Sequence, residues 1–63
     1  SPAMVLKKIE GPVREEIRLA YLPFIDQPDN IRRIVRLCLM ETYGTPEYGF
    51  TPQQVESTCL RRV

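Results

Sequence analysis

Proline spacing is the feature of this 63-residue sequence that most constrains its fold. The six prolines divide the chain into short segments, of which residues 29–45 form the longest internal one. A proline inside a helix removes a backbone hydrogen bond and clashes with the preceding turn, so each proline is expected at the edge of an element. Between the prolines, apolar residues recur at helical spacing. The sequence therefore predicts an all-α fold made of short, sharply bounded helices.

We expect a small orthogonal bundle of three to four short helices around a central third helix. Residues 4–9 could also form a strand, but no second strand candidate exists to pair with them, so a helix is preferred. Residues 1–3 either cap that first helix or are a remnant of cloning. The predicted helices cover residues 2–10, 12–22, 29–43 and 52–63.

Residues 29–43 show the strongest helix signals. Asp29 or Asn30 can cap the N-terminus, and Gly44 stands where a left-handed residue commonly ends a helix. The apolar residues repeat at the i, i+3, i+4, i+7 spacing of one face, and their arc is wide enough to contact two neighbours. We expect this face to lie on the core and three arginines to lie in solvent opposite it. The predicted core face holds Ile31, Ile34, Val35, Cys38 and Leu39, and the predicted exposed face holds Arg32, Arg33 and Arg36.

The stretch that begins the last helix carries the clearest local signal. Thr51 is expected to cap the helix, with Pro52 in the first turn and Gln54 reaching back to complete a capping box. Phe50 precedes the cap and is expected to pack against Val55 as a hydrophobic staple.

Length and composition limit what the chain can do. Sixty-three residues make a single domain with a marginal core, and we expect it to be excised from a larger protein. The net charge is only +1, and the chain has two cysteines and no histidine. That set argues against a metal site and against a conventional catalytic base. No phosphate-binding glycine motif, secretory segment or membrane-length apolar run is present. We therefore expect no cofactor, no enzyme activity and an intracellular protein, in the cytoplasm or nucleus.

The preferred function is a non-catalytic protein-protein interaction module. Such a domain could dock a segment of another protein or associate with itself as a homodimer. The small size, near-neutral charge and broad apolar helix faces favour this interpretation. The residues expected to contact a partner are Arg32, Arg33, Arg36, Met40, Leu19, Leu22 and Tyr48.

The alternative is a helix-turn-helix-like DNA-binding domain in transcription regulation. The sequence VRLCLMETYGTPEYGFTPQQV, residues 35–55, is similar to the lead-in of sigma-factor region 4, where a helix and a glycine-containing loop precede a capped helix. The resemblance covers about a third of the chain and implies no residue role here, because the chain ends where the recognition helix would follow. Connector 44–50 is also longer than the usual turn. The arginines that could contact phosphates are Arg32, Arg33, Arg36, Arg61 and Arg62.

Overall fold

The computed structural model describes residues 9–61, which are all-helical and form no strand. The helix predicted over residues 29–43 is confirmed at both ends, and the predicted helix 2–10 lies almost wholly outside the described residues. The elements are α1 (Glu10–Tyr21), the short 3-10 helix η2 (Leu22–Phe24), α2 (Asp29–Tyr43) and α3 (Pro52–Cys59).

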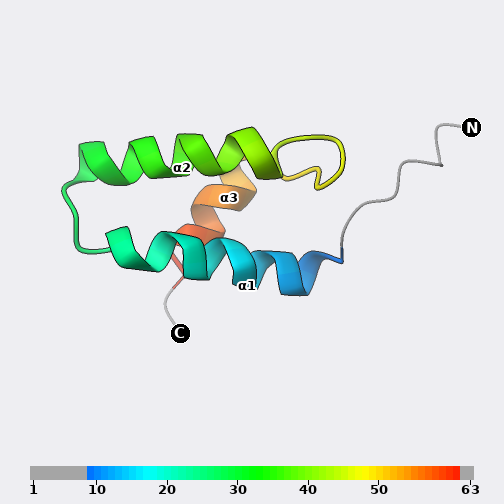
Figure 1. Cartoon of the computed structure of the whole chain (residues 1–63), viewed down its shortest axis with the longest axis horizontal. Helices are drawn as coiled ribbons and strands as arrows, with labels where there is room; N and C mark the ends of the chain where they lie inside the picture. Colours follow the sequence, from blue (N-terminus) through cyan, green and yellow to red (C-terminus); the bar gives the residue numbers. More distant parts are fainter. Residues whose placement is uncertain (1–8, 62–63) are drawn as a thin grey trace, which may run out of the picture.

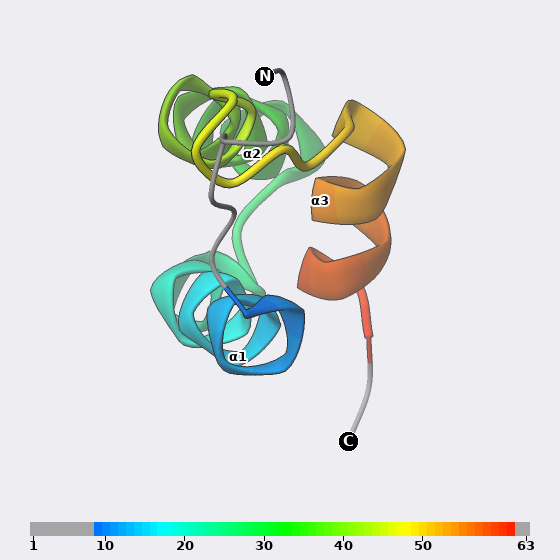
Figure 2. The same cartoon turned by 90° about the vertical axis from the view of Figure 1, so that its right-hand side faces the viewer.

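The arrangement lays the shortest α-helix across the other two. Helices α1 and α2 run side by side in opposite directions, joined through η2, and α3 crosses both of them (Figures 1 and 2). α3 packs extensively on α1 and on α2, whereas these two contact each other less. The predicted central place of residues 29–43 is therefore taken by α3, and α2 contributes only Tyr43 to the fully buried core.

The core lies where the three helices meet the connector between α2 and α3. α1 supplies residues four positions apart, and α3 supplies neighbouring positions of one face, as expected for short amphipathic helices. Partly buried side chains of α2 and the connector cover its edge. The buried residues are Val13, Ile17, Tyr21, Tyr43, Phe50, Val55, Thr58 and Cys59.

The first described helix starts earlier than the sequence predicts. The predicted ranges 2–10 and 12–22 place a break at Gly11, but Gly11 and Pro12 both lie in the first turn of α1. Backbone N–H groups in a first turn have no intrahelical partner, so proline costs little there. The N–H of Val13 donates to the carbonyl of Ile9 at 3.4 Å, which closes this turn.

The last helix ends earlier than the predicted residue 63. α3 ends at Cys59, and Leu60 follows it as an exposed capping residue. Ser57 and Thr58 both donate side-chain hydrogen bonds to the carbonyl of Gln54, at 3.1 and 2.7 Å. Such bonds compete with the helical ladder.

The orientation of α2 agrees with the prediction only in part: Val35 and Leu39 pack against the core as predicted, but the rest of the predicted core face does not. Ile31, Ile34 and Cys38 are exposed, while the Arg36 side chain is only 14% exposed and lies toward the interior. The reason is the buried Tyr21, whose hydroxyl accepts a hydrogen bond from Arg36 Nη1 at 3.0 Å. A buried hydroxyl needs a partner, and hydrophobic spacing alone cannot reveal that requirement.

Two glycines shape the connector between α2 and α3 for different reasons. Gly44 has φ −82°, so the predicted left-handed cap is wrong. A Cβ at Gly44 would instead lie 2.6 Å from the carbonyl oxygen of Met40. Gly49 has φ 75°, the left-handed conformation that glycine adopts without strain. The two glycines therefore let the chain turn closely from α2 into α3.

Candidate functional site

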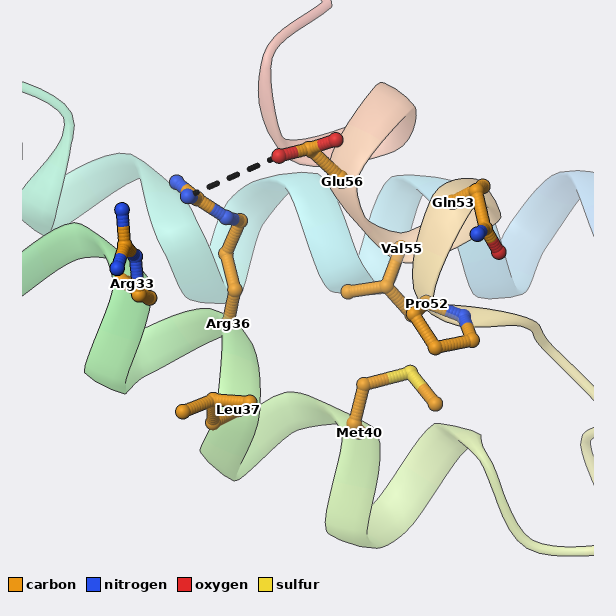
Figure 3. Close-up of a pocket in the computed structure, with 8 residues that line it drawn as sticks. All are labelled: Arg33, Arg36, Leu37, Met40, Pro52, Gln53, Val55 and Glu56. Atoms are coloured by element: carbon orange, nitrogen blue, oxygen red, sulfur yellow. Dashed lines mark ion pairs between the residues drawn. The ribbon is translucent and has the colours of Figure 1, made fainter.

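A groove between α2 and α3 brings together three of the residues predicted to contact a partner. Its volume is about 230 Å³, and it is open to solvent. Figure 3 shows its walls, with α2 on one side and the start of α3 on the other. The lining residues are Arg33, Arg36, Leu37, Met40, Pro52, Gln53, Val55 and Glu56.

The capping box at the start of α3 fixes one wall of the groove. The N–H of Gln54 donates to Thr51 Oγ1 at 3.1 Å, and the N–H of Thr51 donates to Gln54 Oε1 at 2.8 Å. This confirms the predicted box, with Pro52 in the first turn. Because the box sets the direction of the first turn, it positions Pro52 at the groove edge and Val55 at its floor.

The groove has an apolar section formed by both helices. Leu37 and Met40 come from α2, and Pro52 and Val55 come from α3. Val55 is buried, Met40 is half-buried, and Leu37 is 61% exposed. Met40 extends toward Pro52 in Figure 3. Its flexible thioether can adapt to different apolar groups, so this section can accept an apolar side chain.

Two arginines of α2 border the groove, and they differ in how strongly other residues of the domain hold them. Arg36 donates to the Tyr21 hydroxyl and pairs with Glu56 across the groove at 3.8 Å (Figure 3). Arg33 has a 68% exposed side chain and pairs with the exposed Asp29 at 3.4 Å. Exposed pairs contribute little to stability. Arg33 is therefore the cation that a ligand could recruit at low cost.

Burial raises the pKa of two titratable groups in the core. Burial, together with the hydrogen bond that the Tyr43 hydroxyl donates to Glu16, raises the pKa of Tyr43 to about 12. Burial also raises the pKa of the Cys59 thiol to about 11, although Arg36 nearby opposes this shift. A protonated thiol is a poor nucleophile.

The other predicted partner-binding residues lie outside the groove. Arg32 bonds to Asp29 and to the carbonyl of Gln27, both at 3.2 Å, which ties the start of α2 to the preceding turn. Leu19 and Leu22 are exposed, on α1 and η2. Tyr48 contacts Tyr43 edge to face, with ring centroids 4.9 Å apart.

The arginines of the nucleic-acid alternative fall on more than one surface. Arg33 and Arg36 line the groove, whereas Arg61 lines a second cleft of about 390 Å³ between α1 and α3. In that cleft Arg14 donates to Thr58 Oγ1 at 2.6 Å. Arg18 and Glu15 make a two-bonded ion pair, which lowers the pKa of the Glu15 carboxyl. Arg62 lies outside the described residues.

Sequence reasoning missed most of the groove wall on α3. Pro52 and Val55 were predicted as a helix start and a core residue, and nothing in the pattern places them beside α2. Glu56 carries no sequence signal, because its role depends on Arg36 reaching it from another helix. These positions follow from the steep crossing of α3, which local periodicity does not encode.

Comparisons with known proteins do not assign a family. No protein-family model, curated protein or solved structure matches this chain. Within residues 9–61, no helix is long and apolar enough to cross a membrane. The same residues contain no group of three or more His, Cys, Asp or Glu side chains placed to hold a metal ion. The features that indicate a function are therefore the groove and the exposed faces of the helices.

Proposed function

We propose that this domain is a non-catalytic protein-interaction module that docks a short partner segment in the α2–α3 groove. The observation that carries the proposal is an apolar section beside an exposed arginine. Met40 and Val55 supply the apolar contact, and Arg33 supplies a cation whose partner Asp29 is itself exposed.

The size of the groove favours a side chain over a small molecule. Small-molecule sites usually enclose roughly 300–1,000 Å³ and surround their ligand. The groove holds about 230 Å³ and is open along one side. It matches one bulky apolar side chain projecting from a segment that lies across the surface, as in helix-in-groove and extended-peptide recognition.

The charges along the groove indicate which residues the segment carries. Glu56, which pairs with Arg36, would repel a carboxylate near the middle of the groove. Arg33 stands at the opposite end of the groove from Met40, two helical turns or about 10 Å along α2. The segment should therefore carry a carboxylate and a bulky apolar side chain about 10 Å apart. That distance separates positions i and i+3 in an extended peptide or i and i+7 in a helix.

The test uses fluorescent peptides with a glutamate and a leucine at each of these two spacings. Fluorescence anisotropy should show saturable binding for at least one spacing. Binding should be lost when lysine replaces the glutamate, or when alanine replaces the leucine. Arg33→Glu should weaken binding at least about fivefold, because it turns an attractive charge pair into a repulsive one.

The matched control is Arg61→Glu, which makes the same charge change in the other cleft. This variant should bind the peptides like the wild type. Equal losses in Arg33→Glu and Arg61→Glu would mean non-specific charge attraction and would refute the groove as the site. Absence of saturable binding for both spacings would refute the proposed function.

A further inference from the structure

The face of α2 that points away from the other helices carries a stripe of exposed apolar side chains. Ile31 is 36% exposed, Ile34 55% and Leu37 61%, and Cys38 is also exposed. Together these four residues form the outer stripe. Their spacing places them along one side of a 15-residue helix, next to the side that holds Val35, Leu39 and Tyr43 against the domain. A contiguous apolar strip on a domain this small indicates a contact surface.

We propose that the outer stripe pairs with the same stripe of a second copy, with the two α2 helices antiparallel. The charges that flank the stripe favour this occupant. Arg33 lies toward the N-terminal end of the stripe, and Glu41 lies at its C-terminal end. Among the described residues, Glu41 makes no ion pair or side-chain hydrogen bond.

In a dimer with two-fold symmetry, each contact between Arg33 and Glu41 is formed twice. In an antiparallel pair whose axis passes near Leu37, Arg33 of each copy faces Glu41 of the other copy. Ile34 and Cys38 of the two copies then interdigitate on either side of the axis. A parallel pair would instead place Arg33 against Arg33 and Glu41 against Glu41, which is repulsive. The stripe is thus complementary to itself in one orientation.

The expected dimer is weak. Two helices of about 22 Å bury less than the roughly 1,200 Å² typical of stable specific interfaces. We expect a dissociation constant on the order of 10–100 µM. The outer stripe shares Leu37 with the groove, and Arg33 borders both surfaces, but Ile34, Cys38 and Glu41 do not line the groove and so test this inference separately.

Sedimentation equilibrium from about 5 µM to about 1 mM brackets that affinity. The wild type should change from monomer to dimer across this range. Ile34→Asp should raise the dissociation constant at least about tenfold, because the change enters the interface twice. The matched control is Leu19→Asp, which alters an equally exposed leucine on α1 and should dimerise like the wild type. Circular dichroism checks that each variant is folded.

A charge swap tests the antiparallel orientation. Arg33→Glu and Glu41→Lys should each weaken the dimer, and the double variant should restore it to within about threefold of the wild type. A monomer at every concentration would overturn the proposal. Equal weakening by Ile34→Asp and Leu19→Asp, or no restoration in the double variant, would also overturn it. Peptide binding by monomeric Ile34→Asp tests the groove separately, so the two proposals can fail independently.

Discussion

The inward position of Arg36 makes the sharpest prediction about stability. Arg36→Met keeps most of the apolar stem of the side chain but removes its charge and its donors. The variant leaves the hydroxyl of the buried Tyr21 without the donor that satisfies it, and it breaks the 3.8 Å pair with Glu56. If α2 instead presented its arginines to solvent, the same substitution would change stability very little.

The magnitude follows from these two contacts. A hydrogen bond to a charged group contributes about 1.5–3 kcal/mol to stability. That range already includes the cost of leaving the buried hydroxyl without a partner. Glu56 is exposed, so its ion pair adds at most about 0.5 kcal/mol. We expect a loss of about 2 kcal/mol. A core of this size supplies only about 3–5 kcal/mol of stability, so this loss is a large part of the total. For a domain of this length, a loss of about 2 kcal/mol should lower the melting temperature by about 8–16 °C.

Urea unfolding followed by circular dichroism measures this loss, provided that the m-value stays constant. The control, Arg33→Met on the exposed side, should change the free energy of unfolding by less than about 0.5 kcal/mol. Tyr21→Phe completes a double-mutant cycle. The double variant should recover at least about 1 kcal/mol relative to the sum of the single losses, since both polar partners are then absent. Equal effects of Arg36→Met and Arg33→Met, or strict additivity in the cycle, would refute the reasoning.

Three further predictions concern the connector, α3 and its buried thiol. Thr51→Ala should lower the free energy of unfolding by about 1 kcal/mol through loss of the cap, and Thr51→Ser, which keeps the oxygen, should lower it much less in the same urea assay. Gly49→Ala should cost about 1 kcal/mol, because alanine is strained at φ 75°; a neutral result would show that the connector adopts another conformation. The raised pKa of Cys59 means that the folded protein keeps a proton that the unfolded chain releases near pH 9. Stability should therefore be full below pH 9 and fall toward pH 11, by at most about 1.4 kcal/mol per pH unit. Cys59→Ala should remove the fall in stability between pH 9 and 10, which lies below the range in which Tyr43 titrates. If the variant kept the wild-type pH profile, the burial of the thiol would be contradicted.

Proline, glycine and capping residues in the sequence were enough to locate two helices. The bounds of α2 coincide with Pro28 and Gly44, although the predicted side-chain cap by Asp29 or Asn30 does not form and Gly44 is not left-handed. The start of α3 follows from the signals at Thr51, Pro52 and Gln54. These signals are local, because capping residues satisfy backbone groups within a few positions of themselves. Local signals also misled at Gly11, where a first turn tolerates the residues that would stop a helix further along.

The side of α2 that is buried could not be predicted from spacing. The apolar arc of α2 is broad enough to be buried in more than one orientation, and the choice depends on polar groups that come from other helices. Tyr21 requires a donor, and Arg36 is positioned to supply it. The groove was missed for a related reason, since Val55 and Glu56 meet α2 only because α3 crosses it. Three predicted contact residues, Arg33, Arg36 and Met40, nevertheless lie together in the groove.

The reactivity of the two thiols tests the orientation of α2 most directly. Both cysteines are free, with Cys38 exposed on the outer stripe and Cys59 buried in the core. At about 1 µM, where the proposed dimer is dissociated, native protein treated with a thiol reagent at neutral pH should be modified rapidly at Cys38 and slowly at Cys59, as mapped by mass spectrometry. Unfolding the protein in urea should make both thiols react rapidly. Protection of Cys38 in the folded monomer would contradict the account, because it would place the outer stripe inside the core and the arginines in solvent.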